Sequence, residues 1–312
     1  MRRIAFVMLI AVLASPSLVL AEAAGDTKAV LITGASTGIG RNLTEHLAAK
    51  GYFVYAGARK QADLDALNAI KNVQAVKLDV TKQDEIDAAV LTITKANRGL
   101  YALVNNAGVG TIGAATETSL EEFTLVMDVN VFGPYRVTKA FAPLIIASKG
   151  RIATISSTAG IGAPRDLTVY CMSKHAMEAF GDSLAAQMTP LGVQVSLVEP
   201  GNFNSEIGNS VYKRTGKQGR FTDRGKFKQP DEVSAAVELA LFEATPKRRY
   251  MVTPDQNEAE RTMKKQIEQL VQLNEGQLYT YDRDALVKML DEAMATARPK
   301  TETGSIPADR AK

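Results

Sequence analysis

Seven short apolar runs alternate with amphipathic helical patterns along this chain. The runs are continuous rather than alternating in polarity, which is typical of strands buried on both faces of a parallel sheet. The order of strand and helix patterns predicts an α/β fold with a doubly wound parallel sheet flanked by helices. The predicted strands span residues 29–33, 53–57, 73–78, 102–105, 151–156, 194–199 and 250–253.

Helical patterns fill the intervals between these strands and continue beyond the last one. Clear examples span 39–50, 83–98, 168–188 and 231–243. After Pro254 the patterns at 258–273 and 282–297 are charged and mostly one-sided, which predicts a C-terminal helical extension, and 298–312 is polar and predicted to fray. The predicted organisation is therefore a catalytic domain over 24–254 and an extension over 255–312, preceded by a separate N-terminal segment, 1–23.

The N-terminal segment has the layout of an export signal. Arg2 and Arg3 precede an uncharged stretch over 4–21, and small residues follow it. Ser15, Pro16 and Ser17 interrupt the stretch, which favours a signal peptide cleaved after Ala21 or Ala23 over an uncleaved membrane anchor or a buried helix. We therefore expect an exported or membrane-anchored protein, in the periplasm, a lumen or at a membrane. Ile4-Ala5-Phe6 fits the twin-arginine pattern poorly.

Composition narrows the chemistry. The chain has one cysteine, two histidines and a formal net charge of +3. An internal disulfide is excluded, a zinc site of nitrogen and sulfur ligands is not expected, and no charge pattern of a nucleic-acid binder stands out. We therefore expect hydroxyls, amines, carboxylates or an organic cofactor to carry the function, with no metal and no nucleic acid.

A glycine-rich turn over 33–40 follows the first predicted strand and opens a helix. Glycines let the backbone approach a pyrophosphate, and the helix N-terminus offers free N–H groups and a partial positive charge. The end of the second strand carries Arg59 and Lys60 instead of the carboxylate that would grip the ribose of NAD. A 2′-phosphate would fit against these cations, which favours NADP with NAD as the alternative, unless both are solvated surface charges.

Tyr170 and Lys174 stand four positions apart in a helical pattern, so the two side chains share a face about 6 Å apart. An ammonium beside a tyrosine stabilises its phenolate and lowers its pKa toward working pH, as a general base requires. The pair is common by itself and is more often a surface pair.

This pair is one of several motifs that occur in a fixed order, and together they resemble the classical short-chain dehydrogenases/reductases over 28–253. They are the turn over 33–40 with TGxxxGxG spacing, Asp79, Asn105-Asn106-Ala107-Gly108, Asn130 within Val129–Gly133, Ser157, Tyr170 with Lys174, and Pro200-Gly201. The resemblance implies a Rossmann-type fold and an NAD(P)-dependent oxidoreductase acting on CH–OH groups by hydride transfer.

The resemblance also assigns roles. It implies that Tyr170 gives or takes the proton, Ser157 bonds the substrate oxygen, Lys174 binds the nicotinamide ribose and lowers the tyrosine's pKa, and Asn130 holds a relay water. The implied cofactor-binding residues are Gly34, Ser36, Thr37, Gly38, Ile39, Gly40, Arg59, Lys60, Asp79, Val80, Asn106, Ala107, Gly108, Tyr170, Lys174, Pro200 and Gly201. Thr37 is a departure, since NADP-preferring members often carry Lys or Arg there.

Several alternatives stay beside these assignments. Ser156 competes with Ser157, which has the usual family distance from Tyr170. Cys171, His46 and His175 are interpreted as packing or surface residues. A sugar-nucleotide epimerase or dehydratase of the extended type is disfavoured by the glycine spacing, and a non-catalytic cofactor-binding regulator is disfavoured by the intact set of four catalytic residues.

The residues around Tyr170 and Pro200 are similar to those of the hydroxysteroid and retinol dehydrogenase subgroup. This similarity implies that the substrate is a bulky apolar alcohol, ketone or aldehyde. The loop over 202–229 is expected to cover the substrate as a lid. Its basic residues are interpreted as a solvated face, with anionic lipid as the alternative partner. They are Lys213, Arg214, Lys217, Arg220, Arg224, Lys226 and Lys228. The resemblance also implies a homodimer or homotetramer.

Overall fold

The computed structural model describes residues 28–219 and 226–296. In these residues one seven-stranded parallel sheet has the order β3-β2-β1-β4-β5-β6-β7. The strands are β1 (Ala29–Ile32), β2 (Phe53–Ala58), β3 (Val73–Lys77), β4 (Ala102–Asn105), β5 (Arg151–Ile155), β6 (Gln194–Pro200) and β7 (Arg249–Val252). Each lies within one residue of its predicted bounds at either end, which confirms the doubly wound fold.

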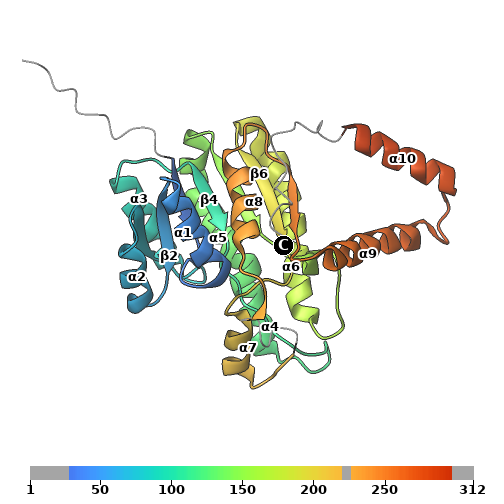
Figure 1. Ribbon diagram of the computed structural model, residues 1–312, viewed down its shortest axis with the longest axis horizontal. Helices are drawn as coiled ribbons and strands as arrows, with labels where there is room; N and C mark the ends of the chain where they lie inside the picture. Colours follow the sequence, from blue (N-terminus) through green and yellow to red (C-terminus); the bar gives the residue numbers. More distant parts are fainter. Residues whose placement is uncertain (1–27, 220–225, 297–312) are drawn as a thin grey trace, which may run out of the picture.

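Helices cover both faces of the sheet and bury two separate apolar layers (Figure 1). One layer packs against α1 (Gly38–Ala49), α2 (Gln61–Asn68) and α8 (Asp231–Phe242). The other packs against α3 (Gln83–Lys95), α5 (Gly133–Ala147) and α6 (Thr168–Met188). Both faces of the strands are therefore covered, which is why their sequences are continuously apolar.

The sheet order places the topological switch point between β1 and β4. From β1 the chain moves outward to β2 and β3, then crosses back to β4 on the other side of β1. Connections at the carboxyl ends of β1 and β4 lead away in opposite directions, which opens a crevice between them. The glycine-rich turn after β1 and the Asn105–Gly108 segment after β4 are brought together at this crevice.

Some helices were not assigned from the sequence. They are α2, α5, α4 (Leu120–Met127) and α7 (Ile207–Thr215). The helix α7 lies within the segment that the sequence predicts as a loop, 202–229, and its Val211 is fully buried. Residues 220–225 of that segment lie outside the described residues, as does the predicted N-terminal segment over 1–23.

The C-terminal extension contains α9 (Gln256–Asn274) and α10 (Arg283–Thr296), as the sequence predicts. The first turn of α9 is fixed to the domain by Glu258, which is buried and accepts hydrogen bonds from Asn202. Further along, α9 extends away from the sheet, and α10 lies apart from it (Figure 1). Over 28–219 and 226–296, no helix combines the length and hydropathy needed to cross a membrane.

Candidate active site

The glycine-rich turn forms a tight cradle at the start of α1. Gly34 has a φ of +66°, a conformation that glycine adopts without strain. A Cβ on Gly40 would lie 2.3 Å from the carbonyl oxygen of Gly34 and 2.4 Å from Nδ2 of Asn106, so no side chain fits there. Within the described chain no side chain caps α1, which leaves its N-terminus facing the cavity with a partial positive charge.

Side-chain hydrogen bonds tie this turn to the segment after β4. The hydroxyl of Thr33 accepts from the backbone N–H groups of Asn106 and Ala107, both at 3.0 Å. Asn106 returns two bonds from Nδ2, to the carbonyls of Thr33 at 2.8 Å and Gly34 at 3.1 Å. Asn106 therefore holds the glycine-rich turn after β1 and the segment after β4 at a fixed separation across the crevice.

The end of β2 places Arg59 close to Asp79. Its Nη1 lies 3.9 Å from Oδ2 of Asp79, while 64% of the Arg59 side chain stays exposed. Both residues line the cavity, whereas Lys60 does not and is the N-cap residue directly before α2. A guanidinium is therefore available at this end of the crevice, and Lys60 is not brought to it.

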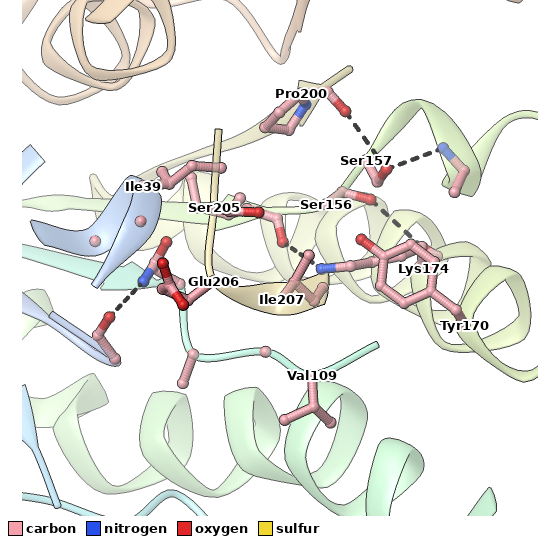
Figure 2. Close-up of a pocket in the computed structure, with 18 of the residues that line it drawn as sticks. Ile39, Val109, Ser156, Ser157, Tyr170, Lys174, Pro200, Ser205, Glu206 and Ile207 are labelled. Atoms are coloured by element: carbon pink, nitrogen blue, oxygen red, sulfur yellow. Dashed lines mark hydrogen bonds between the residues drawn. The ribbon is translucent and has the colours of Figure 1, made fainter. Parts of the chain in front are cut away.

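Tyr170 and Lys174 lie on the same face of α6, and both are buried. The Nζ of Lys174 is 5.7 Å from the centre of the Tyr170 ring and donates a 2.9 Å hydrogen bond to the carbonyl of Ile155 (Figure 2). Burial lowers the pKa of Lys174 to about 8, and the Glu178 carboxylate opposes this shift. The tyrosine thus faces the cavity beside an ammonium that burial makes easy to deprotonate.

Ser157 follows β5 and lines the same cavity. Its hydroxyl accepts a 3.1 Å bond from the N–H of Ala159 and donates to the carbonyl of Pro200 at 3.4 Å (Figure 2). Ser156 also reaches the cavity wall, but it is 3% exposed and directs its hydroxyl to the carbonyl of Lys174 at 3.5 Å. Of the two serines, Ser157 is the more accessible from the cavity.

Asn130 lies one layer behind the cavity, in a short π-helical turn over Asp128–Phe132. Its Oδ1 accepts from the N–H of Val109 at 2.8 Å, and its Nδ2 donates to the carbonyl of Val109 and to the hydroxyl of Ser173. Ser173 in turn donates to the carbonyl of Tyr170 at 2.7 Å. Asn130 is therefore connected to the tyrosine helix through hydrogen bonds, although it does not line the cavity.

The cavity that joins these groups has a volume of about 660 Å³, a size that suits an organic cofactor with a substrate. Except for Lys60 and Asn130, every site residue implied by the family resemblance lines it. Two further elements contribute lining residues that were not named individually from the sequence, although those at α7 fall within the predicted lid over 202–229. They are Ser205, Glu206, Ile207 and Ser210 at α7, and Glu258, Arg261, Thr262 and Lys265 on α9.

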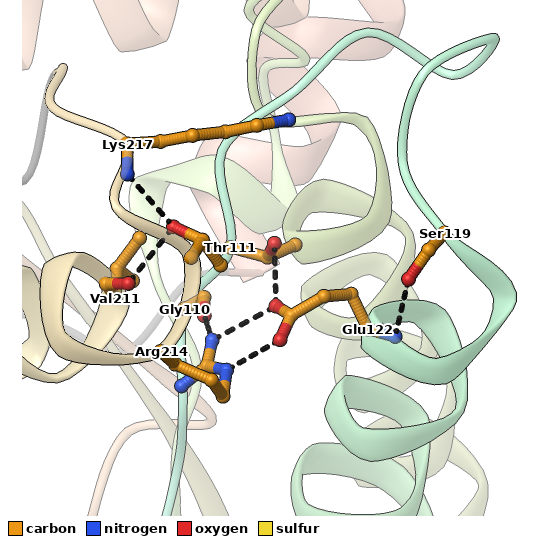
Figure 3. Close-up of polar contacts among 8 residues, drawn as sticks. Gly110, Thr111, Ser119, Glu122, Val211, Arg214 and Lys217 are labelled. Atoms are coloured by element: carbon orange, nitrogen blue, oxygen red, sulfur yellow. Dashed lines mark hydrogen bonds and ion pairs between the residues drawn. The ribbon is translucent and has the colours of Figure 1, made fainter.

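The helix α7 packs directly over the tyrosine. Val211 forms an apolar cluster with Leu167, Tyr170 and Cys171, which confirms Cys171 as a buried packing residue. Polar contacts fix the other side of α7, because Arg214 binds the Glu122 carboxylate and the carbonyl of Gly110 (Figure 3). The prediction of a solvated basic face is therefore wrong for Arg214.

Glu178, Glu199 and Arg249 form a second group of ionisable side chains behind the site, on α6, β6 and β7, and the Arg249 side chain is 39% exposed. Glu199 is 2% exposed, and burial raises its pKa to about 8, with the neighbouring Glu178 carboxylate as the next cause. The Nε of Arg249 lies 3.2 Å from Glu199 and its Nη2 lies 3.2 Å from Glu178. Glu199 directly precedes Pro200, so these charges support the cavity wall.

The chain is similar in sequence and in structure to known proteins of one family. The sequence model described as short chain dehydrogenase matches residues 28–216. The chain belongs to this family. A short-chain dehydrogenase from Streptomyces avermitilis has a similar structure, with a TM-score of 0.67 and 27% identity over 87% of this chain and 98% of that one.

Curated relatives in the family differ in what they act on. The mitochondrial D-beta-hydroxybutyrate dehydrogenase of Bos taurus is 43% identical over 57% of this chain and 54% of its own. Retinol dehydrogenase 5 of Mus musculus is 38% identical over 58% of each chain. An NADPH-dependent 3-dehydrocapnine reductase of Ornithobacterium rhinotracheale is 34% identical over 72% of this chain and 87% of its own. The chain thus spans about half the length of the first two relatives.

Proposed function

We propose that this short chain dehydrogenase is an NADP(H)-dependent oxidoreductase that interconverts an alcohol and a ketone or aldehyde. The observation that carries the proposal is the meeting of Tyr170, Lys174 and Ser157 in one cavity with the glycine cradle of α1. NAD is the alternative cofactor. The cradle fits a pyrophosphate, since the uncapped N-terminus of α1 faces the cavity.

In this proposal, the nicotinamide cofactor supplies the hydride or accepts it. Ser157 bonds the substrate oxygen, and Tyr170 gives that oxygen a proton during reduction or removes it during oxidation. The Lys174 ammonium stabilises the phenolate form of Tyr170 and binds the nicotinamide ribose. Asn130 positions a water that relays protons. The buried surroundings of Tyr170 and Lys174 strengthen these electrostatic effects by keeping bulk water away.

Arg59 supports NADP over NAD. Its guanidinium is largely exposed at the end of β2, where a 2′-phosphate would take the place of a ribose hydroxyl. Apolar side chains support a bulky apolar substrate, because Leu167, Val109 and Ile207 line the cavity beside Tyr170. The name of the 3-dehydrocapnine reductase, which specifies NADPH, points the same way for the cofactor.

The Tyr170→Phe variant tests the proton chemistry. Loss of the hydroxyl should lower kcat by about 10²-fold or more, while the affinity for NADPH stays within about twofold. Tyr135→Phe is a matched control, because Tyr135 is 56% exposed and packs on Phe180 outside the cavity. Unchanged turnover in Tyr170→Phe would refute the mechanism.

A substrate screen tests the cofactor and the substrate class. Steroid, retinoid and simple carbonyl compounds are assayed with NADPH and NADH in parallel, in the wild type and in Arg59→Ala. We expect a preference for NADPH that falls about tenfold or more in the variant. A wild-type preference for NADH would refute the role of Arg59.

We also propose that the protein is exported or membrane-anchored through its N-terminal segment and assembles as a homodimer or homotetramer. The arrangement of Arg2, Arg3 and the uncharged stretch over 4–21 supports the location. Cell fractionation of the full chain and of a chain lacking 1–23 tests it, because only the full chain should reach the membrane or exported fraction. Light scattering of the purified protein tests the assembly, and a monomer would refute it.

A further inference from the structure

One face of α9 contributes charge to the cavity. Glu258, Arg261, Thr262 and Lys265 all line it, and their spacing of three, four and seven positions places them on one side of the helix. On other faces of α9, Met263 and Ile267 are exposed and Lys264 pairs with Glu260. The helix therefore turns a polar face toward the domain.

Contacts along this face show which end of the cavity α9 borders. The backbone N–H of Asn202, directly after Gly201, donates to Oε1 of Glu258 at 3.1 Å. Two turns later, Cγ of Lys265 would lie 3.7 Å from a Cβ on Gly162, and Gln269 donates to the carbonyl of Ile161 at 3.2 Å. The segment that holds Ile161 and Gly162 follows Ser157, so α9 lies at the Ser157 end of the cavity.

The opposite end is closed by other residues. A Cβ on Gly38 would lie 3.3 Å from Cβ of Ser205, so the start of the α7 segment covers the glycine cradle. Glu206 lines the cavity there as well, and its Oε2 accepts a hydrogen bond from Asn209. The cradle thus meets the start of the α7 segment, whereas α9 meets Asn202 and Ile161.

The Ser157 end of the cavity carries an excess of positive charge. Its lining cations are Lys174, Arg261 and Lys265, and its lining carboxylate is Glu258. Glu258 is buried, and Asn202 donates to it from both the backbone N–H and Nδ2. These neutral donors leave the carboxylate charged, so Glu258 balances one of the three cations and the net charge of this lining stays positive. Arg261 is exposed one turn further along α9.

From this arrangement we infer that the substrate carries an oxyanion group, a carboxylate being the simplest, which Arg261 and Lys265 bind while the reacting carbon lies at Tyr170. The inference rests on the proposed function. Leu167, Pro164 and Ile207 line the cavity as well, so the substrate is amphipathic, with an apolar body and one charged end. The extension helix α9 is then part of the substrate site.

Both cations are able to bind a ligand, because Arg261 is exposed and the ion pair of Lys265 is weak. Lys265 pairs with Glu268 at 3.0 Å, but the two side chains are 44% and 59% exposed, and such a pair contributes little. A guanidinium binds a carboxylate through two parallel hydrogen bonds, so Arg261 should bind the substrate's carboxylate more strongly than Lys265 does. Solvent screens these contacts. We therefore expect kcat/KM for an acid substrate to exceed that for its uncharged ester by about tenfold, and not by several orders of magnitude.

Straight-chain keto acids and their methyl esters test the inference in the full-length protein with NADPH. The two compounds of each pair have the same carbon chain, and the ester lacks the negative charge of the acid. In the wild type, kcat/KM for the acid should exceed that for the ester by about tenfold or more, and added salt should reduce the ratio. In the Arg261→Ala/Lys265→Ala double variant, the ratio should fall to about one through a rise in KM for the acid.

Matched variants separate charge from structure. Lys264→Ala should keep the wild-type ratio, because Lys264 neighbours Lys265 in sequence but pairs with Glu260 and does not line the cavity. Lys265→Arg should also keep most of it, since the charge is retained. A wild-type preference for the ester, or an acid preference that survives in the double variant, would overturn the inference. Turnover of neither acids nor neutral carbonyls would instead overturn the proposed function.

Discussion

Arg214 holds Glu122 through two parallel contacts, from Nε to Oε1 at 2.6 Å and from Nη2 to Oε2 at 3.0 Å (Figure 3). The pair joins α7 to α4, and Thr111 donates a third bond to the same carboxylate. Burial alone would raise the pKa of Glu122, but the hydrogen bonds from Arg214 and Thr111 hold it below its usual value. The contact fixes α7 over the tyrosine, because Val211 on the same helix packs against Tyr170.

We therefore predict that Arg214→Lys loosens α7. Lysine keeps the charge but cannot reproduce the paired contact and the bond to Gly110. The KM for substrate should rise about tenfold, equivalent to about 1.4 kcal/mol, and limited proteolysis within α7 should become faster. Arg41→Lys is the control, since Arg41 pairs with Glu45 on the surface of α1. Equal KM and equal cleavage in the two variants would contradict the prediction.

Titration of Lys174 should limit cofactor affinity at high pH. Since burial lowers its pKa to about 8, the ammonium is present below that pH and is lost above it. The Kd for NADPH, measured by fluorescence in the absence of substrate, should therefore rise above a pH of about 8. Lys174→Arg keeps its charge and should show no such rise. A Kd that is constant across this range in the wild type would refute the prediction.

Gly40→Ala should impair the cradle. The added Cβ would meet the carbonyl oxygen of Gly34 at 2.3 Å, and backbone atoms there have nowhere to move. We expect a loss of about 1–3 kcal/mol in stability, together with weaker NADPH binding, measured by thermal unfolding and fluorescence titration. Gly162→Ala is the matched control at the other end of the cavity, where the nearest atom to a new Cβ lies 3.7 Å away. Normal NADPH binding by Gly40→Ala would count against the cradle.

Glu199→Gln should remove a pH dependence of stability. The pKa of Glu199 is raised to about 8 in the folded protein, so the folded state holds a proton that the unfolded state has already lost above its ordinary pKa. Stability should therefore fall as pH rises toward about 8, by at most about 1.4 kcal/mol for each pH unit. Urea unfolding should show a flatter profile for Glu199→Gln. A profile identical to that of the wild type, or to that of the surface control Glu45→Gln, would contradict this.

Much of the fold was predictable because its determinants are local. Continuous apolar runs such as the one at 102–105 follow from burial on both faces, and β4 occupies the same residues. The helix bearing Tyr170 and Lys174 was likewise predicted with its observed bounds, since its apolar spacing is regular. Less of α7 was predictable, because the segment around it is polar and its pattern is typical of a loop. The helix packs on the domain through a tertiary contact, that of Val211 with Tyr170 and Cys171 on α6.

The sequence by itself determined the doubly wound sheet, the glycine turn and the ordered motifs that mark the family, because these depend on residue type at fixed spacing. Tertiary structure alone decided that Arg59 lines the cavity and Lys60 does not, that Arg214 is held by Glu122, and that Arg261 and Lys265 line the cavity. A charged helix such as α9 has the same pattern whether its polar face meets solvent or a cavity. Only packing against Asn202 and Ile161 makes the difference.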